Sequence, residues 1–374
     1  MLHVEVHRLV DQKAWDSIVL RNPLATADYL YMTSPEHFIV KVSGHYQYAL
    51  LLPAESVSIA GRKALVSFGN RRSGGPLPLR VEVSDKEISE ISEAVMLAVD
   101  NFFKKGYAIV NFTVKTYINE LFNKLLLAIL TSGKNKEKIK PFINILNARV
   151  LYMNDLDYKN LWSKVYNKKV RNAIRKFERK GGKVERVKDP LNYFEEIMRI
   201  NLSTPLRQGT PLPQHYTDPQ IVFSTLRKYH EAYGRDGIFR VYRAYTQENK
   251  TVGYAYVLKK GGHVYISRFL IDVKYSSINP GEGLLNGILE DLLSERDIKV
   301  VQYGYWSPKA HPGIDHFLKQ FGFTIGQEVA LWFFKNNLDF KLLSTYLRLK
   351  QAYVPLRHVI KRLASESVPL FKWV

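Results

Sequence analysis

Apolar residues recur at steps of three and four along residues 162–184, which predicts one amphipathic helix. The apolar face of this helix comprises Trp162, Val165, Tyr166, Val170, Ala173, Ile174 and Phe177. Gly181 and Gly182 should end the helix, because glycine readily takes the positive φ that follows a last helical turn. A strand should then begin at Lys183.

The opposite face of the same helix is basic. The stretch holds nine cations against the single acid Glu178, namely Lys164, Lys168, Lys169, Arg171, Arg175, Lys176, Arg179, Lys180 and Lys183. An ordinary exposed face mixes both signs, and like charges four residues apart repel each other. A solvated face is one interpretation. The other is that Lys168, Arg171, Arg175 and Lys176 bind a phosphate-bearing ligand.

The same periodicities divide the rest of the chain into helices and strands. The predicted helices span 84–103, 121–130, 158–180, 191–202, 219–233, 283–295 and 314–321, and the later strands span 107–114, 148–153, 238–245, 251–259, 263–273, 299–306 and 328–334. The order helix, strand, helix, strand at 84–153 returns at 283–334. We therefore predict an α/β chain with two copies of one unit, at 1–153 and 154–336, each a mixed sheet flanked by helices. A basic amphipathic helical tail should follow at 337–374.

Composition narrows the class of partner. The 374 residues carry a formal net charge of +20, which attracts polyanions such as tRNA, anionic lipid headgroups or a phosphorylated cofactor. The absence of cysteine excludes disulfides, thiolate nucleophiles and Cys-ligated metals. No apolar run is long enough for a transmembrane segment and no signal peptide is evident, so we expect a cytoplasmic protein. The tail should dock on the second unit, or alternatively touch an anionic membrane surface.

A glycine pair leads from the strand ending near Val273 into the next helix. Gly281-Glu282-Gly283 stands at the predicted helix N-terminus, where free N–H groups and the helix dipole favour a phosphate. A simple tight turn is the alternative interpretation. If the glycines admit a phosphate, valine at Gly281 or Gly283 should abolish donor binding with little loss of fold.

This segment resembles the acyl-CoA loop of the GNAT N-acyltransferases, Gln/Arg-x-x-Gly-x-Gly/Ala, with Ile278 where that family has Gln or Arg. The resemblance implies an acyl-CoA donor, such as acetyl-CoA, bound partly through the backbone of Leu270 and Ile271. The remaining donor-binding residues that it implies are Val273, Ile278, Asn279, Gly281, Glu282, Gly283 and Leu284.

More of the chain is similar to the FemAB-like branch, in which two GNAT-like domains lie in tandem and some enzymes use aminoacyl-tRNA. The similarity covers residues up to about 335 and rests on Phe68…Gly74-Gly75-Pro76, on the basic helix, on Arg207-Gln-Gly209 and on Tyr303-Gly304-Tyr305. It implies two tandem GNAT-like domains, with the donor bound in the second and Arg207 among the anion-binding residues.

The chemistry implied by that fold is attack of a neutral amine on an activated acyl group. Tyr305, and after it Tyr303, should protonate the leaving group, and Asp272 should act as a base through water. Each of these residues also has a structural interpretation, the tyrosines as core residues and Asp272 as an anchor for the loop. His311 and His316 are five residues apart, which is not a zinc spacing, so we expect no metal.

The sequence thus predicts an N-acyltransferase that moves an acyl group from acyl-CoA to a primary amine of a small molecule or peptide. Two alternatives remain at this point. One is an aminoacyltransferase that uses aminoacyl-tRNA, favoured by the net charge and the basic helix. The other is a protein without catalytic activity that binds RNA or a membrane surface, favoured by Ile278 and by the lack of an obvious base.

Overall fold

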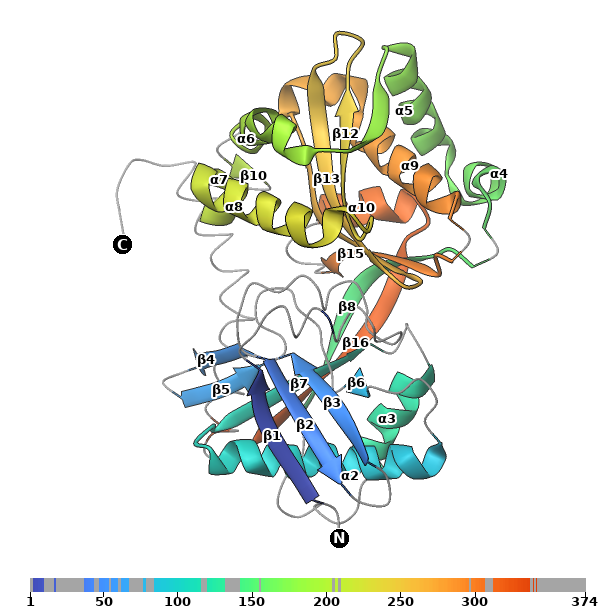
Figure 1. Cartoon of the computed structure of the whole chain (residues 1–374). Helices are drawn as coiled ribbons and strands as arrows, with labels where there is room; N and C mark the ends of the chain where they lie inside the picture. The colour runs from blue at the N-terminus through green and yellow to red at the C-terminus, as the bar shows by residue number, and fades with distance from the viewer. Residues whose placement is uncertain are drawn as a thin grey trace.

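The computed structural model shows two lobes joined by two long strands (Figure 1). It describes residues 3–9, 17, 37–43, 47–53, 55–59, 62–66, 77–78, 84–115, 120–131, 142–154, 156–203, 206–207, 210–295, 297–306, 312–336, 339 and 341. In chain order, the elements up to residue 152 make up the first unit and those from residue 158 onward the second. A ten-stranded sheet runs through both, in the order β4-β5-β7-β16-β8-β15-β14-β13-β12-β9.

The first unit combines the start of that sheet with a small second sheet. The small sheet has the order β1-β2-β3-β6 and comprises β1 (His3–Leu9), β2 (His37–Ser43), β3 (Gln47–Pro53) and β6 (Leu77–Pro78). The large sheet receives β4 (Glu55–Ile59), β5 (Arg62–Val66), β7 (Ile109–Lys115) and β8 (Phe142–Tyr152), and the helices are α2 (Asp85–Lys104) and α3 (Glu120–Thr131). Strands β5 and β7 are parallel, and the chain between them includes α2.

Helix α2 forms where the sequence predicts it because both of its ends carry recognisable signals. At the start, the Ser84 hydroxyl accepts from the Glu87 N–H and the Glu87 carboxylate accepts from the Ser84 N–H, which is a capping box. At the end, Gly106 takes φ 89°. Ile91, Val95 and Phe102 of α2 then pack into one apolar core with β7 and β16.

The second unit is a sheet covered by helices on both faces (Figure 1). Its strands are β9 (Lys183–Val187), β12 (Phe239–Tyr245), β13 (Thr251–Lys260), β14 (His263–Ile271), β15 (Val300–Trp306) and β16 (Thr324–Phe334), with β10 (Leu206–Arg207) and β11 (Thr210–Pro211) as a separate hairpin. One face packs on α6 (Phe194–Asn201), α7 (Gln214–Thr217) and α8 (Pro219–Tyr229). The other packs on α5 (Lys168–Arg179), α9 (Pro280–Leu293) and α10 (Pro312–Gln320).

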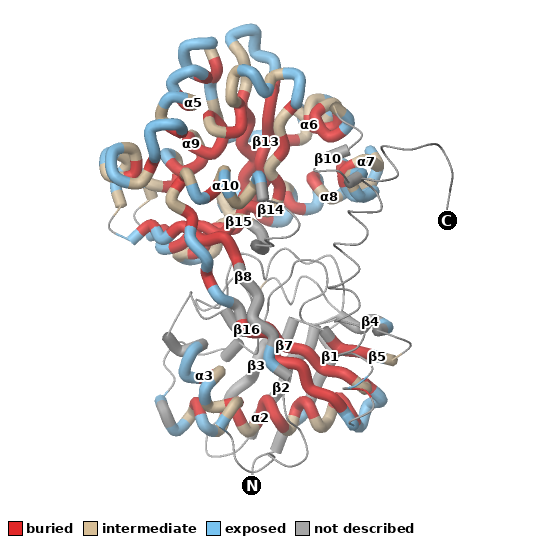
Figure 2. The backbone as a smooth tube through the Cα atoms, turned by 180° about the vertical axis from the view of Figure 1, so that it is seen from behind, coloured by how far each residue is buried: buried red, intermediate tan, exposed pale blue. Residues whose placement is uncertain are grey.

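The two units exchange their last strands. Strand β8 ends the first helix-strand-helix-strand repeat, yet it pairs antiparallel with β15 of the second. Strand β16 ends the second repeat, yet it pairs antiparallel with β7 of the first. The two exchanged strands also pair with each other, from Thr324↔Val150 to Trp332↔Phe142, so backbone hydrogen bonds continue without a break through the waist of the molecule. Figure 2 colours the described residues 148–150 of β8 and 329–334 of β16 as buried, whereas Ile143, Ile325 and Gln327 are exposed.

The predicted single helix at 158–180 is interrupted. A short α4 (Tyr158–Asn160) continues into a π-helical turn at Leu161–Val165, the chain extends at Tyr166, and Asn167 caps a new helix, α5, by accepting from the Val170 N–H at 2.9 Å. Apolar periodicity persists across the break because both segments pack on the same core, which includes Tyr166 and Phe177.

The predicted fold class, two units each with a mixed sheet flanked by helices, is confirmed. The unit boundaries stay a prediction, and a cut at 336 would give the second unit a strand whose Leu331 and Phe333 lie in the core of the first. Strand β4 was not predicted. Apart from residues 339 and 341, the predicted tail at 337–374 lies outside the described residues. Within the part of the chain that is described, no helix is long and apolar enough to cross a bilayer.

The capping box makes a testable contribution to the first unit. Ser84→Ala should lower the free energy of unfolding by about 1 kcal/mol, because it leaves N–H groups of the first turn without their acceptor. Urea denaturation followed by circular dichroism measures this. Ser89→Ala, at an exposed position of the same helix, is the matched control and should cost nothing. An equal loss in both variants would contradict the assignment.

Candidate active site

Two parallel strands in the sheet of the second unit part, which leaves a break in the backbone ladder that we call the cleft. Strands β14 and β15 pair from His263↔Val300 only as far as Ile266↔Tyr303, although both continue. Each strand also has a bulge there, at Ser267 against β13 and just after Gln302 against β8. Because a bulge bends its strand away from the ladder, the two bulges together account for the separation.

Aromatic side chains surround the point where the strands part. The Phe269 ring lies 5.7 Å from the Tyr303 ring and 6.1 Å from the Phe317 ring, measured between centroids. A Cβ added at Gly281 would meet only ordinary contacts, at 3.8–4.0 Å, from Ile271, Phe269 and Phe317. The start of α9 therefore faces an apolar, aromatic region between β14 and α10.

The loop between β14 and α9 is more ordered than the sequence suggests. Strand β14 ends at Ile271, and Val273–Ile278 form a 3-10 helix instead of extending the strand, so the predicted strand end at Val273 is wrong. Asn279 takes a left-handed conformation at φ 58°, and Pro280 begins α9. Pro280 has no N–H, and the N–H of Gly283 donates to the Asn279 carbonyl at 3.2 Å.

Asp272 anchors this loop. Its side chain is 1% exposed, forms an ion pair with Arg199 and accepts from the Lys274 N–H at 3.1 Å. Arg199 also donates to the Thr251 carbonyl, which ties the loop to α6 and β13. A buried carboxylate held by a guanidinium is poorly placed to accept a proton from a substrate, so these contacts favour the structural interpretation of Asp272 over the catalytic one.

Packing requires glycine at positions 283 and 287 of α9 but not at position 281. A Cβ at Gly283 would overlap the Phe177 ring of α5, and a Cβ at Gly287 would come within 2.6 Å of Val184. Gly283 and Gly287 are four residues apart on one side of α9, where they let α5 and β9 approach closely. The expectation that valine at Gly283 would spare the fold is therefore wrong. Only Gly281 has no packing reason of this kind.

The other predicted donor-binding residues divide between the two cores. Leu270 packs toward α6 and α8, and Leu284 is fully buried toward α5. Val273 is 41% exposed, while Ile271, Ile278, Asn279 and Glu282 are half-buried near the cleft. Of the predicted donor-binding residues, Leu284 thus packs its side chain in the core. The loop residues beside Gly281 remain candidates.

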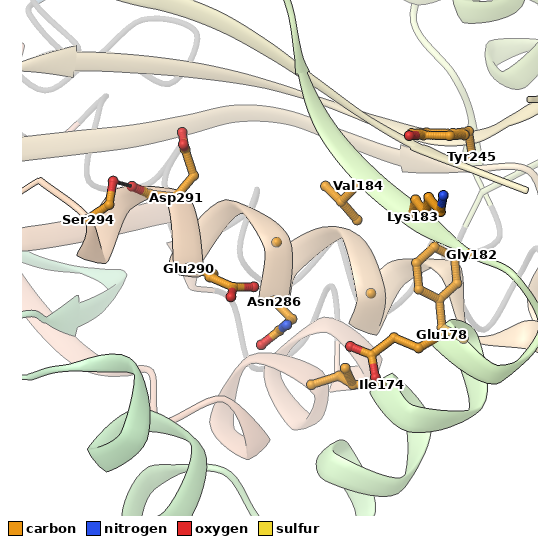
Figure 3. Close-up of a pocket in the computed structure, with 13 residues that line it drawn as sticks. Ile174, Glu178, Gly182, Lys183, Val184, Tyr245, Asn286, Glu290, Asp291 and Ser294 are labelled. Carbon is orange, nitrogen blue, oxygen red and sulfur yellow. Dashed lines mark hydrogen bonds between the residues drawn. The ribbon is translucent and has the colours of Figure 1, made fainter.

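A hollow of about 560 Å³ lies on the other side of α9, against α5 and β9 (Figure 3). Glu178, Glu290 and Asp291 line it. Burial raises the pKa of the Glu290 carboxyl, and the nearby Glu178 carboxylate adds to the increase. These three acids outnumber Lys183, the one lysine in the lining, so the hollow disfavours phosphates and does not suit the predicted donor. No cluster of three metal-ligating side chains occurs among the described residues.

The cleft, with its parallel strands and crossover helix, agrees with the comparisons. Residues 164–308 match the family described as acetyltransferase (GNAT) domain. The second unit contains a GNAT acyltransferase domain. No sequence among curated proteins is similar enough to match the chain.

Three solved structures resemble most of the chain, including this GNAT domain. FemX has a TM-score of 0.56 and 13% identity, over 87% of this chain and 96% of FemX. The C-terminal domain of a putative lysylphosphatidylglycerol synthetase from Agrobacterium fabrum has a TM-score of 0.52 and 12% identity, over 89% and 94%. A protein of unknown function from Bacteroides thetaiotaomicron has a TM-score of 0.55 and 10% identity, over 88% and 100%. The predicted resemblance to FemAB-like tandem GNAT proteins is confirmed for the fold, and the match to the GNAT family covers residues 164–308.

The basic residues of α5 lie near the start of the GNAT domain and differ in how exposed they are. Lys168, Arg175 and Lys176 are exposed on α5, and the Arg175 guanidinium lies 5.5 Å from the centroid of the Trp162 ring. Arg171 instead donates to the carbonyls of Trp162 and Tyr166, at 3.2 and 2.5 Å. It closes the end of the π-helical turn, a role that the charge pattern did not reveal. We therefore take Arg171 for a structural residue and retain the other three as anion-binding candidates.

The predicted acids lie on the GNAT strand beside the cleft. The Tyr303 ring is half-buried against Phe269 and Phe323, and Tyr305 follows the bulge of β15, opposite Ala148. Arg207 belongs to the β10–β11 hairpin. The side chains of Tyr305 and Arg207 lie outside the described residues, so their predicted roles stay predictions.

A pair of substitutions separates packing from binding in α9. Gly283→Ala should destabilise the protein by about 2 kcal/mol or more, because its Cβ overlaps the Phe177 ring. Gly281→Ala should leave stability unchanged or raise it by about 0.5–1 kcal/mol, because alanine favours the helix and meets no overlap. Chemical denaturation measures both. A Gly283→Ala variant as stable as the wild type would show that Phe177 moves aside freely.

Proposed function

We propose that the chain transfers an aminoacyl group from the ribose ester of an aminoacyl-tRNA to a primary amine, in the cleft between β14 and β15. The observation that carries this proposal is the composition of the first turn of α9. A CoA pyrophosphate bound there would need several free N–H groups. Pro280 has none, the Gly283 N–H makes the first intrahelical bond to the Asn279 carbonyl, and of this turn only the N–H groups of Gly281 and Glu282 remain, beside the negative Glu282 carboxylate.

The basic face of α5 supports the same donor. Exposed cations along α5, with only Glu178 of opposite sign, suit a long polyanion better than a single pyrophosphate. The helix begins the GNAT domain and packs on α9 through Phe177 and Gly283, so an RNA held on α5 would lie on the same layer as the donor loop. One protein with a similar fold is named a putative lysylphosphatidylglycerol synthetase. The lysyl group of that name is an aminoacyl group, which agrees with an aminoacyl donor.

The reaction requires few protein groups. The neutral amine attacks the ester carbonyl, a C–N bond forms, and the C–O bond to the ribose breaks. Negative charge that develops on the carbonyl oxygen can be stabilised by a backbone N–H at the end of β14, near Leu270 and Ile271. The attacking nitrogen loses its proton to water, and Tyr305 gives a proton to the leaving ribose oxygen. Because the ester is already activated, no deprotonated carboxylate is needed at Asp272.

Acyl-CoA is the second candidate donor, and one observation favours it. A Cβ at Gly281 would meet no overlap and yet the residue is glycine, as expected where a ligand approaches the backbone. Thermal unfolding with and without acetyl-CoA distinguishes the two donors, because a ligand at about 100 times its dissociation constant stabilises the folded state by about 2.7 kcal/mol. We expect no shift with acetyl-CoA, and a clear rise in Tm would favour the CoA enzyme.

The basic face gives a second test. A triple variant in which Gln replaces Lys168, Arg175 and Lys176 should bind tRNA more weakly. Its plot of log K against log salt should be less steep by about two or three, since each neutralised phosphate releases about one counterion. Gel-shift titrations at several salt concentrations measure this. The control variant replaces Lys86, Lys124 and Lys335, which are exposed elsewhere, and should keep the wild-type slope. Equal slopes in both variants would remove α5 from any role in RNA binding.

The proton donor can be tested separately. Tyr305→Phe should lower turnover by about 100-fold while leaving donor affinity unchanged, because it removes one hydroxyl and keeps the ring. Tyr303→Phe, whose ring packs against Phe269, is the comparison and should have the smaller effect. Single-turnover measurements of amide formation give both rates. An unchanged rate in Tyr305→Phe would reassign the donation to Tyr303 or to water.

A further inference from the structure

A half-buried aromatic ring stands beside the basic residues of α5. It belongs to Trp162, in the π-helical turn that precedes the helix. The Trp162 ring lies 6.1 Å from the Tyr158 ring and 6.0 Å from the Tyr166 ring, measured between centroids. Tyr166 is 2% exposed and belongs to an apolar core of the second unit. The indole is therefore anchored on the core while part of it reaches the surface.

Arg175 of α5 lies over this ring. Its guanidinium is 5.5 Å from the centroid of the Trp162 ring, which is within the range of a cation–π interaction. Arg175 is exposed, and within the described part of the chain no carboxylate forms an ion pair with it. Because a guanidinium is planar, one of its sides can lie on an indole while the other stays open to a second flat group. The two residues thus present a flat cation that the protein holds in position.

The charges around Arg175 suit a chain of phosphates. Lys168 lies seven residues before Arg175, which is about two helical turns, so both residues share one side of α5. Lys176 is also exposed. Proteins that bind single-stranded nucleic acid combine such cations with flat side chains on which bases stack. A double helix keeps its bases stacked inside, so it could use only the charges. The combination of residues therefore favours an unpaired strand.

Helix α5 also adjoins the loop that carries Gly281. Its Phe177 packs against Gly283 of α9, and α5 contacts the 3-10 helix Val273–Ile278 that follows β14. The ester of an aminoacyl-tRNA is on the last ribose of an unpaired strand, so the bases next to it are free to stack on a protein. An unpaired end that crosses α5 would thus approach the loop beside the cleft.

We propose that Arg175, held over Trp162, is a stacking platform for an unpaired base of the RNA donor. The inference rests on the proposed function and adds which part of the RNA the protein contacts. It also assigns different roles to the cations of α5. Lys168 and Lys176 neutralise phosphates, whereas Arg175 stacks on a base. Arg175→Lys keeps the charge and removes the planar group, so this variant separates the two roles.

Fluorescence anisotropy with labelled RNA tests the platform. The probes are an oligoadenylate of about a dozen nucleotides and a blunt RNA duplex of the same length. A surface that acts through charge alone prefers the duplex, which has the higher charge density, so we expect the wild type to prefer the oligoadenylate instead. Arg175→Lys should bind the oligoadenylate about tenfold more weakly, with an unchanged salt slope and unchanged affinity for the duplex. Trp162→Leu, which removes the ring beneath the guanidinium, should have a similar effect.

A second cation–π pair provides the matched control. On α8, across the sheet from α5, the Arg227 guanidinium lies 5.8 Å from the centroid of the Phe223 ring. Arg227→Lys and Phe223→Leu make the same chemical changes there and should leave the affinity for both probes unchanged.

The outcomes separate this inference from the proposed function. Equal oligoadenylate affinity in Arg175→Lys and wild type, or a wild type that prefers the duplex, would overturn the platform and leave the proposed tRNA donor standing. Failure to bind either RNA would overturn both. Stronger binding to phosphatidylglycerol vesicles than to the oligoadenylate, at equal phosphate concentration, would overturn the platform by making α5 a lipid-binding surface.

Discussion

The backbone pairing of β8 with β16 is the interaction on which the rest of the molecule depends. It is antiparallel, spans Thr324↔Val150 to Trp332↔Phe142, and connects two half-sheets into one. A sheet interior leaves no freedom to shift register, because a slip of one residue would turn every side chain to the opposite face. The positions of the two units relative to each other are therefore fixed by hydrogen bonds of the main chain and not by a surface interface.

The cleft of the GNAT domain follows from this arrangement. Strand β15 pairs with β8 on one side and with β14 on the other. The bulge after Gln302 prevents it from pairing along its whole length with both strands. The pairing on the β14 side ends at Tyr303, and the first turn of α9, with the buried Pro280 and Gly281, packs beside the place where the strands part. Pairing with β8 on one side of β15 thus accompanies the loss of pairing with β14 on its other side.

The sequence predicted local features well and non-local ones poorly. The capping box at Ser84 and the apolar face through Phe177 depend on neighbours within a few residues, so periodicity was enough to find them. The same reasoning assigned Gly283 to a phosphate, because spacing alone does not distinguish a glycine that admits a ligand from one that admits the ring of Phe177. Asp272 was considered as a base for a similar reason, since its partner Arg199 is 73 residues away. The charge pattern likewise could not show that Arg171 is used to close a helical turn.

The strand exchange also affects how the polypeptide matures. Asn111 bonds to a residue 220 positions further along the chain, and the core around α2 contains Leu331 and Phe333. During synthesis, the amino-terminal half leaves the ribosome long before these residues are made. Until then it lacks β16, the strand that lies between β7 and β8. Contacts of such long range make folding slow and leave apolar surface open to chaperones in the interval. Because β16 pairs with β7, the sheet of the first unit is complete only after the last described strand of the second unit has been synthesised.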